Sequence, residues 1–116
     1  MKFYSTNDSQ QVVSLKEAVL KGLAPDQGLY MPVEIPQMSQ DFLDRIHQLS
    51  FKEIGYEVIN AFFSEDLSPS EITDLVDHTL QFDAPLVPIE EGVFALELFH
   101  GPTLAFKDFG ARFCSK

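Results

Sequence analysis

Residues 50–80 read SFKEIGYEVINAFFSEDLSPSEITDLVDHTL and decide the fold of the first part of the chain. Two Ser-x-x-Glu capping boxes begin at Ser50 and Ser68, and in each box Ser and Glu satisfy otherwise unpaired backbone N–H groups. Pro69 stands where its missing N–H does no harm. Each box precedes apolar residues at helical spacing: Phe51, Ile54, Val58, Ile59, Phe62 and Phe63, then Ile72, Leu75, Val76 and Leu80. The stretch predicts two amphipathic helices.

Toward the N-terminus the sequence predicts two more helices and two short extended segments. Residues 14–17, Ser-Leu-Lys-Glu, form another capping box, and Gly22 is a natural stop for the helix that follows. A weaker helix is expected from about 39 to 47. Residues 2–5 are a candidate strand, and residues 28–32 look like a turn that leads into a second one.

Toward the C-terminus the spacing changes from helical to strand-like. Residues 86–89 and 93–99 are apolar and predict a hairpin, with Pro88 on a sheet edge. Residues 109–114 resemble the first turns of a helix that has no cap or polar tail. We therefore expect an α+β or α/β fold: a mostly helical domain with short strands over 1–85, and the first strands and truncated helix of an α/β domain over 86–116.

Composition excludes several classes of function. With 45% apolar and 22% charged residues, the chain is typical of a soluble globular segment. Eighteen acidic residues against 8 basic ones give a net charge of −10, which argues against binding to nucleic acid or to an anionic membrane surface. His47 and His78 have no partners at metal-ligand spacing, so no metal site is predicted.

The single cysteine, Cys114, cannot form an internal disulfide, which favours a reducing compartment. The N-terminus lacks the apolar run of a signal peptide, and no stretch approaches the roughly 18 apolar residues of a membrane span. We therefore expect a cytoplasmic protein.

Residues 97–113, ELFHGPTLAFKDFGARF, contain the candidate chemistry. A strand is expected to end near Phe99, a Gly-Pro pair to break it, and a helix to begin near Lys107 or Asp108. Ligands bind at strand–loop–helix junctions of α/β folds, because backbone N–H groups and the helix dipole converge there.

Lys107 lies among Leu104, Phe106 and Phe109. Apolar surroundings favour the neutral amine, which is the form that attacks an aldehyde. Local chemistry alone, however, favours an ordinary surface lysine paired with Asp108.

Two segments resemble a known family. FHGPTLAFKDFGARF, at 99–113, is similar to the cofactor-lysine segment of the threonine synthases, which are pyridoxal-phosphate enzymes of the tryptophan-synthase-like fold type II family. EAVLKGLAPDQGLY, at 17–30, is similar to that family's N-terminal signature, which usually has glycine where this chain has Gln27. The order of the two motifs and their distances from Met1 make the resemblance specific, and it covers essentially the whole chain.

The resemblance implies the N-terminal part of an enzyme that converts O-phospho-L-homoserine and water to L-threonine and phosphate. Lys107 aligns with the lysine that forms a Schiff base with pyridoxal 5′-phosphate and later moves protons on the substrate. Phe106 aligns with a residue near the cofactor ring. His100, Thr103 and Asp108 become candidate contacts of cofactor or substrate.

Structural roles remain open for these polar residues. Thr103 would otherwise cap the helix, His100 would bond the backbone, and Asp26 would stabilise a turn. Arg112 lies just over one helical turn beyond Lys107, but a solvated or ion-paired arginine is the favoured reading.

In this family, the loop for the substrate carboxylate and the glycine-rich cradle for the cofactor phosphate lie downstream of the lysine. We therefore expect residues 1–116 alone to be inactive and not to bind the cofactor stably. The remainder of the catalytic domain is the expected partner. Two alternatives are a related pyridoxal-phosphate-dependent phospho-lyase and a non-catalytic interaction module or degenerate paralogue. The presence of Lys107 weighs against the second.

Overall fold

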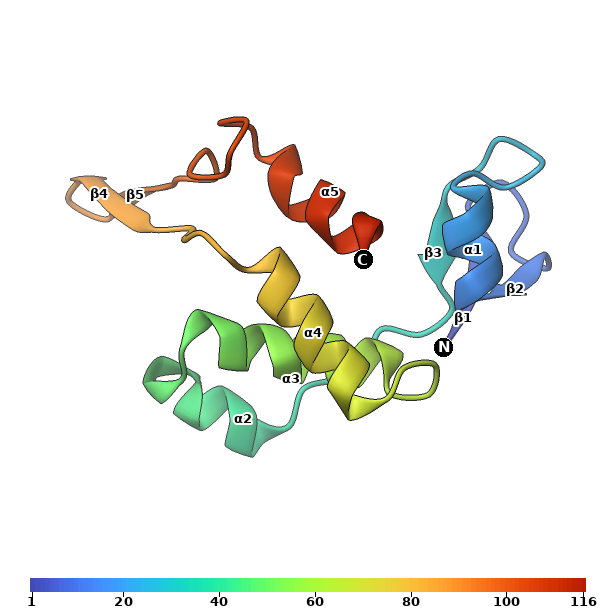
Figure 1. Cartoon of the computed structure of the whole chain (residues 1–116), viewed down its shortest axis with the longest axis horizontal. Helices are drawn as coiled ribbons and strands as arrows, with labels where there is room; N and C mark the ends of the chain where they lie inside the picture. The colour runs from blue at the N-terminus through green and yellow to red at the C-terminus, as the bar shows by residue number, and fades with distance from the viewer.

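The computed structural model describes residues 1–116 and confirms a mixture of helices and short strands (Figure 1). The strands are β1 Lys2–Ser5, β2 Val12–Ser14, β3 Tyr30–Pro32, β4 Leu86–Glu90 and β5 Val93–Leu96. The helices are α1 Leu15–Lys21, α2 Gln40–Arg45, the 3-10 turn η1 Ile46–Gln48, α3 Phe51–Phe63, α4 Pro69–Thr79 and α5 Lys107–Ser115.

The chain is open rather than compact. Figure 1 shows the N-terminal sheet with α1 apart from the helices α2 to α4, while the β4–β5 hairpin projects on the far side. The radius of gyration is 16.2 Å, whereas a compact chain of this length has a radius of about 13 Å. Only 11 of the 116 residues are buried, so the molecule has a small core and much exposed apolar surface.

The N-terminal unit is an antiparallel sheet in the order β2-β1-β3, with α1 packed beside it. Ser14 caps α1, because its Oγ accepts a hydrogen bond from the Glu17 N–H at 3.2 Å. The predicted capping box is only half formed, since the Glu17 carboxylate pairs with Lys21 Nζ at 2.7 Å instead. Gly22, with φ +69°, ends the helix as predicted. Strand β2 was not predicted.

The helices α3 and α4 form as predicted, each with a complete capping box at Ser50 or Ser68. The expected buried face of α4 is confirmed, with Ile72 fully buried and Leu75 and Val76 nearly so. Gly55 of α3 allows the close packing of the pair, because a Cβ there would lie 2.5 Å from Leu80 Cδ1.

The apolar stripe of α3 is only partly covered, and this differs from the expectation for a helix inside a core. None of its residues is fully buried, and Phe51 stays 41% exposed. The weaker helix expected from about 39 to 47 is present as α2, with Ser39 as its N-cap and Phe42 buried. The regular α-helix ends at Arg45, and the chain continues as a 3-10 turn.

The predicted hairpin is present, with a bulge between Pro88 and Glu90 and with Gly92 at φ +75° in its turn. Its second strand ends at Leu96 rather than Phe99: Glu97 N–H still bonds Pro85 O at 2.9 Å, and the chain then leaves the ladder. The sheet has only these two strands, so Pro88 does lie on an edge.

Helix α5 returns from the hairpin and packs against α4. Phe109 lies with its ring centroid 4.6 Å from that of Phe82 and 6.4 Å from that of Phe51. Phe113 lies 5.9 Å from Phe63. None of the helices combines the length and apolarity needed to cross a bilayer.

Candidate functional site

The loop between β5 and α5 presents Lys107 as the first residue of the helix, where the sequence predicted that the helix would begin. The lysine side chain is exposed, and it takes part in none of the ion pairs of the chain. Leu104 and Phe106 are each 74% exposed, while Phe109 turns toward α3 and α4. The apolar surroundings expected for Lys107 are therefore not formed by these residues.

Asp108 does not pair with Lys107, so the surface ion pair suggested by local chemistry is also wrong. Its carboxylate is buried and turns back into the preceding loop. Oδ1 accepts a hydrogen bond from the Thr103 hydroxyl at 2.6 Å, and Oδ2 accepts one from the Thr103 N–H at 2.9 Å. The Thr103 hydroxyl, followed by the Thr103 N–H, holds the pKa of Asp108 below its usual range, so the carboxylate is ionised near neutral pH.

Thr103 is therefore not the helix cap that its position suggested. The N-cap residue of α5 is Phe106, and no side chain bonds the first turn from that position. Thr103 instead donates both of its hydrogen bonds to Asp108, a residue inside the helix. The sequence offered no signal for this arrangement, because the two residues lie five positions apart and not three as in a capping box.

His100 bonds a side chain rather than the backbone. Its Nε2 lies 2.7 Å from Glu97 Oε2, and the Phe99 ring stacks on the imidazole at 4.8 Å. The other ring nitrogen, Nδ1, makes no hydrogen bond within the chain, and the residue is exposed.

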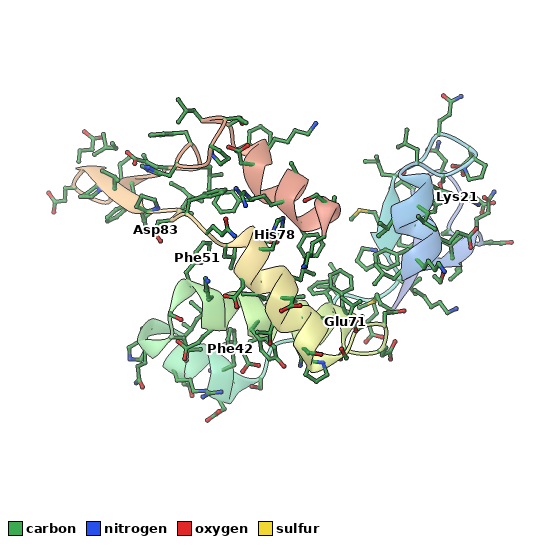
Figure 2. All side chains as sticks on the ribbon, viewed as in Figure 1. Lys21, Phe42, Phe51, Glu71, His78 and Asp83 are labelled. Atoms are coloured by element: carbon green, nitrogen blue, oxygen red, sulfur yellow. The ribbon has the colours of Figure 1, made fainter.

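Arg112 faces away from the lysine and anchors α5 to the end of α4. Its Nη1 donates to Gln81 Oε1 at 2.9 Å and to the His78 carbonyl at 3.3 Å, and its guanidinium lies over the Phe82 ring. Figure 2 shows His78 at the end of α4, beneath α5. The arginine is half-buried and makes no ion pair, and its hydrogen bonds join α5 to α4 and the residues that follow it.

Asp26 also has a structural place, in the turn that follows α1. Both of its oxygens accept hydrogen bonds from the Ser5 hydroxyl, at 2.7 and 2.9 Å, and Oδ1 also accepts the Gly28 N–H at 2.9 Å. The Ser5 hydroxyl, then the Gly28 N–H, lowers the pKa of Asp26. The turn-stabilising reading of Asp26 is confirmed.

The donor set at the β5–α5 junction suits part of an aldehyde cofactor. Lys107 offers a primary amine free of any acidic partner, and the residue before it, Phe106, has an exposed ring. The same junction has no glycine-rich run of backbone N–H groups that would hold a phosphate. These residues fit the covalent attachment of such a group and leave its phosphate to other parts of a protein.

Comparison with known proteins points to one family. The family described as threonine synthase N terminus matches residues 2–80. The threonine synthase of Escherichia coli strain K12 is 38% identical over 116 residues, which are 100% of this chain and 27% of that protein. The Schizosaccharomyces pombe threonine synthase is 39% identical over 119 residues, covering 97% of this chain and 23% of that protein.

Solved structures agree with the sequence comparison. The crystal structure of E. coli threonine synthase superposes with a TM-score of 0.91 at 38% identity, over 99% of this chain and 27% of that one. The structure of threonine synthase with bound pyridoxal phosphate from Brucella melitensis has a TM-score of 0.87 at 35% identity, over 99% of this chain and 26% of that one. This chain thus spans about a quarter of the length of its relatives. Because the family match covers most of the sequence and the fold agrees throughout, the chain belongs to the threonine synthase N-terminus family.

Proposed function

We propose that residues 1–116 are the N-terminal part of a threonine synthase, which converts O-phospho-L-homoserine and water to L-threonine and phosphate. The observation that supports this most is the exposed amine of Lys107 at the first position of α5, in the segment that resembles the family's cofactor-lysine motif. In this proposal residues 1–85 are an N-terminal domain and 86–116 begin the cofactor-binding domain. We also place the enzyme in the cytoplasm.

Pyridoxal phosphate, when bound, would supply an electron sink for the loss of phosphate and the addition of water. Lys107 would hold the cofactor through its Nζ and, once released, move protons at Cα and Cβ of the substrate. Its exposure suits this role, because both cofactor and substrate must reach the amine. Phe106 would offer its exposed ring as an apolar surface beside the cofactor ring.

The polar residues of the loop divide into two roles. His100 remains a candidate contact, since Glu97 holds Nε2 and leaves Nδ1 for a ligand. Thr103 and Asp108 satisfy each other, so we assign them to the support of the loop. The substrate carboxylate and the cofactor phosphate would be bound by the remainder of the catalytic domain, and residues 1–116 alone would be inactive.

The experiment uses the whole protein that contains this chain. The purified protein should attach pyridoxal phosphate to Lys107, detected by mass spectrometry after borohydride reduction, and should release phosphate and threonine from O-phosphohomoserine. Lys107→Ala should abolish both the attachment and the turnover. Lys16→Ala is the matched control, because Lys16 is also exposed and also lacks an ion-pair partner. If Lys107→Ala keeps cofactor and turnover, the assignment is wrong.

A further inference from the structure

The loop of residues 101–106 enters α5 with little support from its own backbone. Only Gly101 within it is buried, and residues 102–107 are all exposed. Two turn-type backbone bonds are present, from Leu104 N–H to Gly101 O at 3.1 Å and from Asp108 N–H to Ala105 O at 3.0 Å. Leu104 has φ +58°, a left-handed conformation that a leucine adopts only under constraint from its surroundings. Something outside the backbone must therefore hold the loop.

The buried carboxylate of Asp108 provides that support. It is 7% exposed although the residues before it in the sequence are exposed. Its two oxygens accept one hydrogen bond each from the hydroxyl and the N–H of Thr103, five residues back. Hydrogen bonds to an ionised acceptor are shorter and stronger than neutral ones, so this pair closes the loop onto the helix.

Gly101 makes room for the carboxylate. A Cβ on Gly101 would overlap the Oδ2, Cγ and Cβ atoms of Asp108. The φ of Gly101 is not in the left-handed region, so backbone conformation does not require glycine there. Glycine is needed at this position because a larger side chain would have no space. Gly101, Thr103 and Asp108 are therefore packed against one another at the base of the loop.

We propose that Asp108 is a positioning residue for Lys107, an inference that rests on the proposed function. Successive residues of a helix point about 100° apart around its axis. Asp108 is fixed inward against Thr103, Phe109 packs against Phe51 of α3, and Arg112 bonds the His78 carbonyl of α4. Lys107 is therefore left on the outward side, where it is exposed. The carboxylate of Asp108 is turned into the loop and the residue is only 7% exposed, so in this proposal it acts on the lysine through the loop and not by contact with the cofactor.

The test compares variants of the whole protein by two measurements that do not depend on turnover. Hydrogen–deuterium exchange of residues 101–107 in the cofactor-free protein reports closure of the loop. The rate at which added pyridoxal phosphate becomes fixed to Lys107 by borohydride, followed by mass spectrometry, reports presentation of the amine. We expect Asp108→Ala and Gly101→Ala to speed exchange and to slow attachment at least tenfold. Thr103→Val, which keeps its N–H, should change both in the same direction and by less.

Conservative variants are the matched controls. Asp108→Asn can accept the Thr103 N–H and donate to the Thr103 hydroxyl, and Thr103→Ser keeps both donors, so each should remain within about threefold of the wild type. Since Thr103 is exposed, its variants test the idea even if Asp108→Ala fails to fold. Attachment at the wild-type rate in Asp108→Ala or Thr103→Val, with or without faster exchange, overturns the inference alone. A wild type that never attaches cofactor at Lys107 overturns the proposed function and the inference together.

Discussion

At the scale of single residues, Gln27 occupies a backbone conformation that glycine adopts more easily. It has φ +67° in the turn between Asp26 and Gly28. The turn is tight, because a Cβ on Gly28 would overlap Ser5 Oγ, and Ser5 itself is fully buried. A residue with a Cβ in this conformation should have a measurable cost in stability.

We expect Gln27→Gly to stabilise the protein by up to about 1 kcal/mol. A left-handed conformation costs a residue with a Cβ roughly 1–2 kcal/mol, and the greater freedom of glycine in the unfolded chain offsets part of that gain. Gln37→Gly is the control, because Gln37 is also exposed and its φ is not positive. Chemical denaturation of both variants measures the effect, and a lower midpoint for Gln27→Gly than for the wild type would contradict the prediction.

At the scale of elements, the sequence was most informative where helix chemistry is local. The boxes at Ser50 and Ser68 predicted α3 and α4, because capping partners lie three residues apart. Strand β2 escaped prediction because its three residues are too few to show alternation. The position of Lys107 came from resemblance. Its open surroundings and the bonds of Asp108 could not be predicted, because they depend on where the loop folds.

Ser68→Ala should destabilise the protein by about 1 kcal/mol, through loss of the cap of α4. Ser68 holds the pKa of Glu71 below its usual range, by its hydroxyl first and its N–H second. Because folding lowers the pKa of Glu71, its hydrogen bonds with Ser68 contribute their full stability above the unfolded pKa of Glu71. That stability is lost as the pH falls through the folded pKa. The difference from wild type should therefore shrink in acid. Ser64→Ala, at an exposed serine whose hydroxyl makes no hydrogen bond, is the control for thermal melts at pH 7 and pH 3.

At the scale of the whole molecule, the chain's own N-terminus ties the sheet to the helices. The Met1 ammonium lies 2.6 Å from Glu65 Oε2 and 2.7 Å from Asp66 Oδ2, in the turn between α3 and α4. A hollow of about 440 Å³ lies beside this contact, lined in part by Val33 and Ala61, so little else packs there. Asp66 first and Glu65 second raise the pKa of the terminal amine.

This tie should weaken in alkali. Because folding raises the pKa of the terminal amine, these ion pairs contribute their full stability below the unfolded pKa of about 8. That stability is lost as the pH rises through the folded pKa. A Glu65→Gln, Asp66→Asn double variant should therefore be less stable than wild type at pH 7, and the difference should shrink as the pH rises through the raised pKa of the amine. A Glu90→Gln, Glu91→Gln double variant, at the end of β4 and in the hairpin turn, is the control. Urea denaturation measures the stability of each variant. If the double variant remains as much less stable than wild type in alkali as at pH 7, the ion pairs with Met1 are not the cause of the difference.

Arg112 anchors α5 to the end of α4, and Lys107 lies at the start of the same helix. A tilt of α5 around this anchor would therefore move Lys107. The two residues are five positions apart, or about 7.5 Å along the axis. A tilt of about 10° around the anchor would displace the start of the helix by roughly 1 Å, and a misplacement of that size can slow a catalysed step on the order of 100-fold. In the proposed enzyme, a shift of α3 and α4 would therefore displace the Lys107 amine and slow the catalysed step.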